Sequence, residues 1–73
     1  MGKIDRLRLG RHPQTGAYSV AALDHNGNVT SLMQDAKGFP FETMDPVEAG
    51  ATIAAKAKEL GVSWERRDRG LAQ

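Results

Sequence analysis

The sequence predicts an α+β fold in which a three-stranded antiparallel meander carries one helix on one face. Residues 46–60 have helical periodicity and a boundary signal at each end. Two short apolar segments flank Asn26-Gly27, the strongest short signal for a β-hairpin. A further alternating segment, residues 3–9, precedes them. All 73 residues are expected to form one small domain whose last residues, 68–73, fray.

The first predicted strand, residues 3–9, alternates leucine with arginine. Arg6 and Arg8 share one face of this strand and the leucines share the other, because successive side chains of a strand point to opposite faces. Arg11 lies in the loop predicted to follow, where it is expected to continue the arginine surface.

The second and third strands are predicted at residues 17–23 and 28–33, on either side of the Asn-Gly turn. A two-residue loop would place Ala22 opposite Ser31. One face of this hairpin is bulkier and is therefore assigned to the helix side. That face consists of Tyr18, Val20, Ala22, Val29 and Met33.

The segment before the helix, residues 39–44, is apolar but irregular, because Pro40 lacks a backbone donor. Phe39 and Phe41 are expected to close the core beside the start of the helix. After the helix, residues 62–66 are predicted to add a short last strand.

The predicted helix begins after Asp45, whose carboxylate is suited to cap the first amides. Pro46 fits the first helical position, and Glu48 is placed to close a capping box. Gly61 is suited to the left-handed conformation that ends a helix. The stripe expected to face the sheet is Gly50, Ile53, Ala54, Ala57 and Leu60. Because these residues are mostly small, the sheet is expected to supply most of the core volume.

Composition excludes several classes of protein. The chain has no cysteine, which rules out disulfides and thiolate metal sites, and its two histidines show no metal-ligand spacing. Ten basic against nine acidic residues give a net charge of +1, unlike a strongly basic nucleic-acid binder. No apolar run approaches the roughly 20 residues of a membrane span, and the charged start is unlike a secretory signal. We therefore expect a protein of the cytoplasm, the host's if the chain is phage-encoded. A chain this small is expected to draw extra stability from a partner or from self-association, and a homodimer is one of these alternatives.

No constellation of residues indicates catalysis. The carboxylates are scattered, and no serine lies in a motif that supplies a base. Asp24-His25, the nearest approach to an acid–imidazole pair, falls at the predicted hairpin tip, where solvated side chains are the rule. The chain is therefore predicted to be a non-enzyme without metal or cofactor.

Binding is better supported, since arginines gather near both ends of the chain and one group includes the only tryptophan. Arginine and tryptophan often dominate protein interfaces, and they also suit nucleic-acid contact. The competing interpretation is that Trp64 packs over the core and the arginines are solvated. The candidate partner-binding residues are Arg6, Arg8, Arg11, Trp64, Arg66, Arg67 and Arg69.

The sequence resembles small phage anti-CRISPR proteins, which are short, cysteine-poor chains, often of one sheet and one helix. The pattern is a Gly-x-Tyr-x-Val strand followed by an alanine-rich helix that begins at Asp-Pro. Here these residues are Gly16, Tyr18 and Val20, then Asp45, Pro46, Ala49, Ala54 and Ala57. The resemblance implies an inhibitor that blocks a host complex, such as a CRISPR effector, by occupying a surface.

Residues 15–20, the Asn-Gly turn and the passage from residues 41–44 into the helix are also similar to the arm-binding domains of phage tyrosine integrases. That resemblance implies DNA contact through the sheet, although residues 29–33 lack the basic side chains of the integrase strand. Residues 38–49 are similar to part of HicB-like antitoxins. The mixed charge favours a protein partner, or a nucleoprotein complex, over bare nucleic acid. The alternative is a small DNA- or RNA-binding module that uses the sheet and the terminal arginines.

Overall fold

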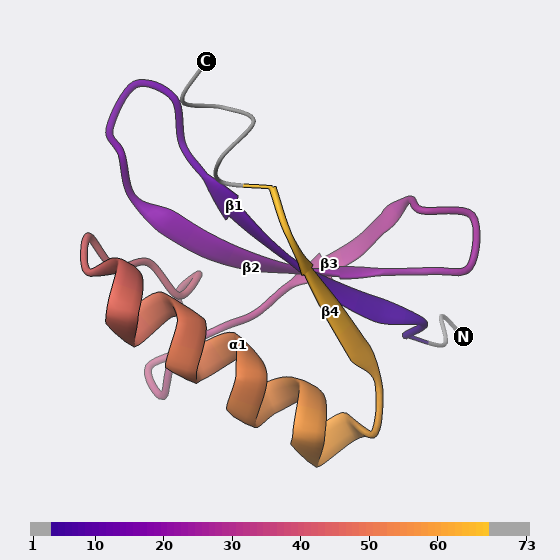
Figure 1. The fold of residues 1–73 in the computed structure, drawn as a ribbon. Helices are drawn as coiled ribbons and strands as arrows, with labels where there is room; N and C mark the ends of the chain where they lie inside the picture. Colours follow the sequence, from indigo (N-terminus) through magenta and orange to yellow (C-terminus); the bar gives the residue numbers. More distant parts are fainter. Residues whose placement is uncertain (1–3, 68–73) are drawn as a thin grey trace.

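A computed structural model describes residues 4–67 as a four-stranded sheet with one helix against one face (Figure 1). The order of the strands across the sheet is β3-β2-β1-β4. The elements are β1 (Arg6–Arg11), β2 (Tyr18–Leu23), β3 (Val29–Leu32), α1 (Pro46–Leu60) and β4 (Ser63–Arg66). The predicted α+β class, antiparallel meander and helix bounds are confirmed, whereas the expected fraying of 68–73 lies outside the described residues.

The last strand is confirmed and lies at the edge of the sheet beside β1. It runs parallel to β1, with Leu7 opposite Trp64 and Arg8 opposite Glu65. A parallel neighbour requires a crossover connection, and α1 provides it between β3 and β4. β1 extends to Arg11, beyond the predicted end at Leu9, because its pairing with β2 continues to Tyr18.

The β2–β3 hairpin confirms the predicted pairing of Ala22 with Ser31 but not the two-residue loop. Leu23 pairs with Val29, so the connection is longer and a bulge interrupts the ladder next to Ala22. The carboxylate of Asp24 explains the longer turn, because its Oδ1 accepts the backbone N–H groups of Asn26 and Asn28, each at 2.9 Å. Its pKa is lowered, chiefly by the Asn28 N–H. The bulge also breaks the predicted alternation, and Val29 is 54% exposed instead of covered by the helix.

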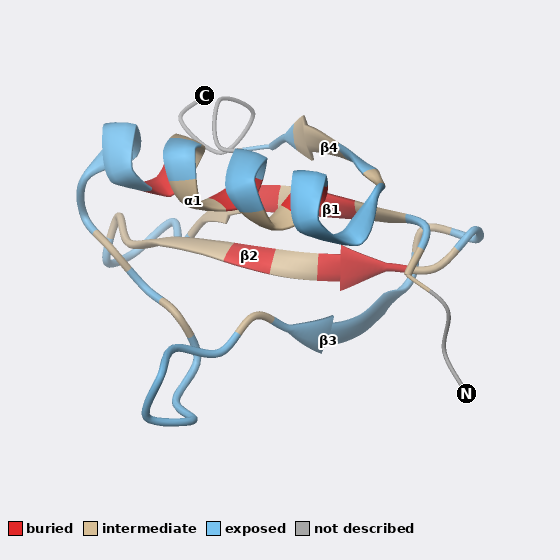
Figure 2. Cartoon of the chain, turned by 90° about the horizontal axis from the view of Figure 1, so that it is seen from below, coloured by how far each residue is buried: buried red, intermediate tan, exposed pale blue. Residues whose placement is uncertain are grey.

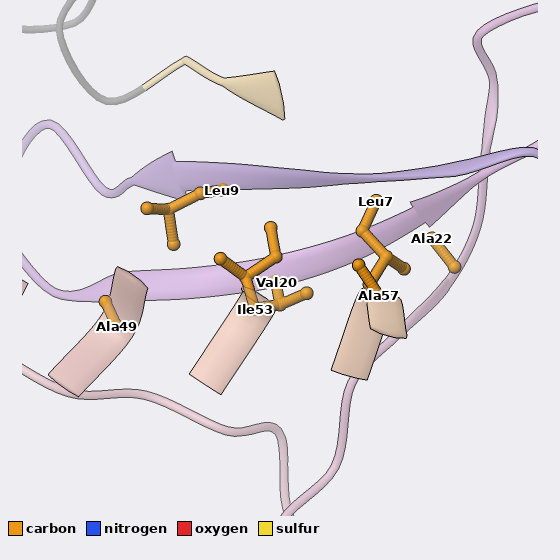
Figure 3. Close-up of a cluster of buried hydrophobic side chains, with 7 residues drawn as sticks. All are labelled: Leu7, Leu9, Val20, Ala22, Ala49, Ile53 and Ala57. Carbon is orange, nitrogen blue, oxygen red and sulfur yellow. The ribbon is translucent and has the colours of Figure 1, made fainter. Parts of the chain in front are cut away.

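The core lies between α1 and the strands β1 and β2 (Figure 3). The sheet contributes Leu7, Leu9, Val20 and Ala22, and the helix contributes Ala49, Ile53 and Ala57. Small helical residues therefore meet larger strand residues, as the sequence predicted. Burying a side chain such as Ile53 completely is worth roughly 1.5–3 kcal/mol.

The buried stripe of α1 is rotated from the predicted one. Its centre is Ala49, Ile53 and Ala57, whereas Ala54 is exposed and Leu60 is 39% exposed. Alanine occurs on several sides of this helix, so the hydrophobic pattern alone did not fix which side faces the sheet.

Both ends of α1 carry the predicted caps, with one difference. The Asp45 carboxylate accepts the Val47 N–H at 2.9 Å, and Gly61 is left-handed with φ of 72°. Glu48 does not close a capping box, because its carboxylate accepts the hydroxyl of Thr43 at 2.6 Å. Thr43 Oγ1 in turn accepts the N–H of Asp45 at 3.2 Å, which replaces the expected bond.

The chain between β3 and α1 turns outward past the edge of the sheet, and Figure 2 shows it extending beyond β3. The turn is held by the Asp35 N–H donating to Phe39 O at 2.8 Å, and by the bridge between Gln34 and Pro40. Phe41 packs against the core as predicted, but Phe39 is 65% exposed. The prediction for Phe39 was wrong because the Asp35 turn carries it away from the helix.

Candidate protein-binding face of the sheet

α1 covers one side of the sheet and leaves the other side without a helix over residues 4–67 (Figures 1 and 2). We call the uncovered side the open face and define it by Arg6, Arg8 and Glu65. Strand alternation sends the two arginines to this side, because Leu7 and Leu9 point into the core. The predicted sharing of one face by Arg6 and Arg8 is therefore confirmed.

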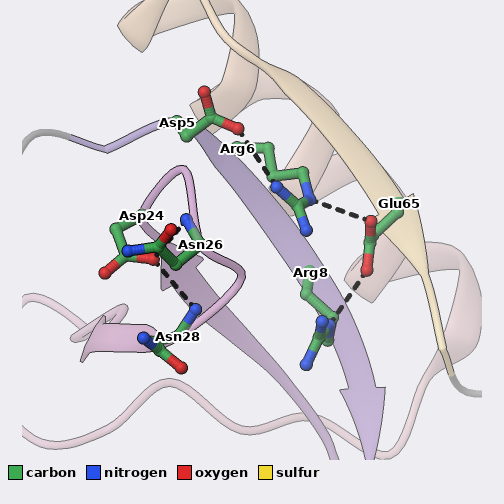
Figure 4. A network of polar contacts seen from close by, with 7 residues as sticks. All are labelled: Asp5, Arg6, Arg8, Asp24, Asn26, Asn28 and Glu65. Atoms are coloured by element: carbon green, nitrogen blue, oxygen red, sulfur yellow. Dashed lines mark hydrogen bonds and ion pairs between the residues drawn. The ribbon is translucent and has the colours of Figure 1, made fainter.

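Glu65 bridges the two arginines across the β1–β4 pair (Figure 4). Its Oε1 accepts Arg6 Nε at 3.1 Å, and its Oε2 accepts Arg8 Nε at 3.0 Å. Asp5 binds Arg6 Nη1 at 3.1 Å. The pKa of the Glu65 carboxyl is lowered, chiefly by the hydrogen bond from Arg8 and next by that from Arg6. The pKa of Arg6 is raised by Glu65 and then by Asp5. Glu65 and Arg6 therefore stay charged near neutral pH.

The two arginine side chains are similarly exposed, 28% for Arg6 and 27% for Arg8, but they differ in the number of their carboxylate partners. Arg6 has two carboxylate partners, and its Nη2 would lie 3.4 Å from a Cβ added to Gly27 at the hairpin tip. Arg8 has no partner other than Glu65 among residues 4–67 and keeps its two terminal nitrogens available. Arg8 is thus held in position at Nε while it presents donors outward.

The remaining candidate residues do not join this pair. Because β1 reaches Arg11, alternation places Arg11 on the helix side, where its Nη2 would lie 3.4 Å from a Cβ on Gly16. The expectation that Arg11 continues the arginine surface was wrong. Trp64 is half-buried and packs against the core, so the competing interpretation holds for it.

The C-terminal arginines are divided as well. Arg66 is exposed and reaches α1, where its Nη1 would lie 3.8 Å from a Cβ on Gly50. Arg67 is exposed, and its backbone N–H donates to Leu9 O at 2.7 Å. Arg69 lies outside the described residues. The candidate site of the sequence therefore separates into an open-face pair, a helix-side group of Arg11, Trp64 and Arg66, and Arg67, which follows β4 in the alternation of Glu65.

Sequence reasoning missed the two carboxylates of this face. Glu65 was placed in the last predicted strand, but no local pattern showed that this strand would pair with β1. Asp5 adjoins Arg6 in the chain and was visible only as an unassigned charge. Within this network of ion pairs, two guanidiniums and two carboxylates sum to zero.

Two surface hollows lie elsewhere. A groove of about 530 Å³ runs between α1 and the β2–β3 side of the sheet, and its lining includes Ile4, Met33 and Leu60. A second hollow of about 490 Å³ lies beside His12, whose Nδ1 accepts the Gln14 and Thr15 N–H groups at 3.2 and 3.3 Å. Over residues 4–67 no group of three or more His, Asp or Glu side chains could hold a metal ion. No helix in that range is long and apolar enough to cross a bilayer.

No protein-family model matches this chain, and neither a curated protein nor a solved structure is significantly similar to it. The open face is therefore the feature from which function is inferred.

Proposed function

We propose that this chain is a non-enzymatic binding protein that occupies a surface of a partner protein through the open face of its sheet. The observation that carries the proposal is the Arg6–Glu65–Arg8 bridge on a sheet face that no helix covers. An arginine already held by a carboxylate loses less conformational freedom on binding, which lowers the cost of forming an interface. Alternating charge on this face also supports specific pairing with a partner of complementary charge.

The same charges favour a protein partner over nucleic acid. A phosphate backbone approaching Arg6 and Arg8 would also meet the carboxylates of Asp5 and Glu65. This network therefore has no net positive charge with which to displace the counterions of a nucleic acid. Arg11 lies on the helix side and adds no positive charge to this network. A small DNA- or RNA-binding module remains the second candidate, because the free end of Arg8 can bind a phosphate.

The narrower form of the proposal follows from the resemblance to phage anti-CRISPR proteins. In that form the chain is a phage-type inhibitor that blocks a host complex, such as a CRISPR effector, by covering part of its surface. The protein acts in the cytoplasm of the host and needs no cofactor or metal.

The test compares two charge reversals on the same strand, Arg8→Glu on the open face and Arg11→Glu on the helix side. We expect the wild-type chain to protect phage from CRISPR interference in a plaque assay, and to be captured with the effector from the same cells. Arg8→Glu should reduce capture at least about tenfold, because the interface loses a central arginine. Arg11→Glu should leave capture unchanged. Circular dichroism of both variants confirms that they fold.

Two results would overturn the proposal. The binding function fails if Arg8→Glu and Arg11→Glu have equal effects on capture. The protein-binding class fails if the chain shifts duplex DNA or RNA on a gel and the affinity falls steeply with salt. Normal interference in cells that express the wild-type chain would reject only the inhibitor form.

A further inference from the structure

β3 is an uncharged edge strand of four residues, and the bulge in its pairing with β2 leaves Thr30 without a partner in that ladder. Its four residues, Val29–Leu32, are all exposed and include neither a charge nor a proline. Short length and bulges are two of the devices by which proteins keep edge strands from pairing with other chains, and β3 lacks the other two common ones, charged side chains and prolines. The opposite edge, β4, carries Glu65 and Arg66. The two edges of this sheet therefore differ in their capacity to accept another strand.

The backbone N–H and C=O groups of Leu32 lie on the side of β3 that faces away from β2. Its neighbour Ser31 pairs with Ala22, and the N–H of Met33 donates to Val20 O at 2.9 Å. Because consecutive residues of an antiparallel strand alternate between bonding the neighbour and facing outward, the N–H and C=O of Leu32 face outward. Within residues 4–67 the outer side of this segment is occupied only from Met33 onward, where the Phe41 N–H donates to Met33 O at 2.8 Å.

We propose that β3 pairs antiparallel with β3 of a second copy of this chain. The absence of charge suits a self-pairing, because a charged residue in so short a strand would lie beside its own copy and repel it. The partly exposed Leu32 and Val29, at 49% and 54%, would gain cover from the same contact. A 73-residue domain whose core cluster has seven buried residues is also of the size at which association commonly adds stability.

Two-fold symmetry and the Asp35 turn after β3 fix the register of this pairing. A two-fold axis normal to the sheet and passing beside Ser31 places Leu32 of each copy opposite Thr30 of the other. A register moved further toward Met33 would bring the second strand against Phe41, which already occupies that side. The two four-stranded sheets would then form one continuous sheet. Because the axis is normal to the sheet, both open faces would lie on the same side.

This arrangement does not depend on the proposed partner, but it would present two copies of the Arg6–Glu65–Arg8 bridge in one plane. Such a dimer binds a partner with repeated sites more tightly than one copy does, without any new contact.

The test measures the mass of the purified full chain by sedimentation equilibrium over a concentration series. The wild-type chain should approach twice 7.9 kDa, with a dissociation constant on the order of 100 μM or tighter. Leu32→Lys adds a charge to the edge and should weaken dimerisation at least about tenfold. Val47→Lys is the matched control, since Val47 is 78% exposed at the start of α1 and the substitution is of the same kind. It should leave the dissociation constant unchanged.

A second measurement needs no variant. The amide of Leu32 should exchange with solvent at the rate of an exposed amide in dilute protein, and more slowly as concentration rises. A wild-type chain that stays monomeric up to about 1 mM overturns the proposal. So does a dimer that Leu32→Lys and Val47→Lys affect equally, or a Leu32 amide whose exchange does not depend on concentration. A dimer without Arg8-dependent capture would overturn the proposed function alone, and a monomer with normal Arg8-dependent capture would overturn this inference alone.

Discussion

Glu65 fixes the positions of the two arginine side chains on the open face. Its two carboxylate oxygens accept one bond each from Arg6 and Arg8, which fixes both guanidiniums relative to the plane of the sheet. These side chains are only partly covered, so the ion pairs are screened by solvent and add little to stability on their own. The main consequence of these ion pairs is that the Arg8 side chain is already positioned before a partner binds.

Glu65→Gln tests this at the level of stability. The pKa of Glu65 is lowered from 4.5 in the folded protein, so its ion pairs stabilise the fold above that pH and are lost as pH falls through the folded-state pKa. We expect the variant to have a lower urea midpoint than the wild type at pH 7. The two midpoints should converge as the pH falls below the folded-state pKa, where the carboxyl is protonated in both the folded and the unfolded protein.

The matched control is Glu59→Gln, which removes an exposed pair with Lys56 at 3.5 Å. This substitution should leave the midpoint nearly unchanged at both pH values. A Glu65→Gln midpoint that differs from the wild type by the same amount at pH 7 and in acid would show that the effect is not electrostatic.

The helix shows how an element is bounded by its own sequence and positioned by its neighbours. Asp45 and Gly61 end α1 through bonds to nearby backbone groups, so these boundaries are local. The side of α1 that is buried is set by the strands it meets. The two glycines of this region consequently have opposite roles, since Gly61 needs a left-handed backbone and Gly50 lies inside the helix without a positive φ.

Alanine substitutions at these two glycines should change stability in opposite directions. Gly61→Ala should lower the free energy of unfolding by about 1 kcal/mol, because a side chain is strained at φ of 72°. Gly50→Ala should raise it by about 1 kcal/mol, because alanine favours the helix interior. Its new Cβ would meet only the end of the Arg66 side chain at 3.8 Å. Urea unfolding at pH 7 measures both, and a loss of stability in Gly50→Ala would mean that this side of the helix is more closely packed.

Over residues 4–67, a small buried cluster between α1 and the centre of the sheet holds the two layers together (Figure 3). β3 takes no part in this cluster, and all four of its residues are exposed. A chain of 73 residues has a total stability of roughly 5 kcal/mol, so losing one central side chain is a large fraction of the total.

Ile53→Ala should therefore leave the chain close to unfolding. Ile53 is completely buried at the centre of the cluster, and the substitution should cost about 2–5 kcal/mol. Ile53→Val should cost about 1 kcal/mol and leave a measurable folded state. Val47→Ala, at an exposed position on the same helix, should change the urea midpoint little. Equal effects at Ile53 and Val47 would show that the cluster does not hold the two layers together.

The sequence by itself determined the elements whose signals are local. The bounds of α1, its caps at Asp45 and Gly61, and the pairing of Ala22 with Ser31 all depend on residues a few positions apart. The sharing of one strand face by Arg6 and Arg8 depends on alternation alone. Interactions over short stretches of chain are encoded in residue type and spacing.

Only the tertiary structure decided which distant groups meet. The pairing of β4 with β1 brought Glu65 to the arginines across 57 and 59 positions of the chain. Two further outcomes depended on how the layers pack: the rotation of α1 and the half-buried position of Trp64. The Asp35 turn exposed Phe39, and the extension of β1 moved Arg11 to the helix side. The physical reason is that packing between layers and pairing between distant strands depend on every element at once, whereas a local pattern reports only its own neighbours.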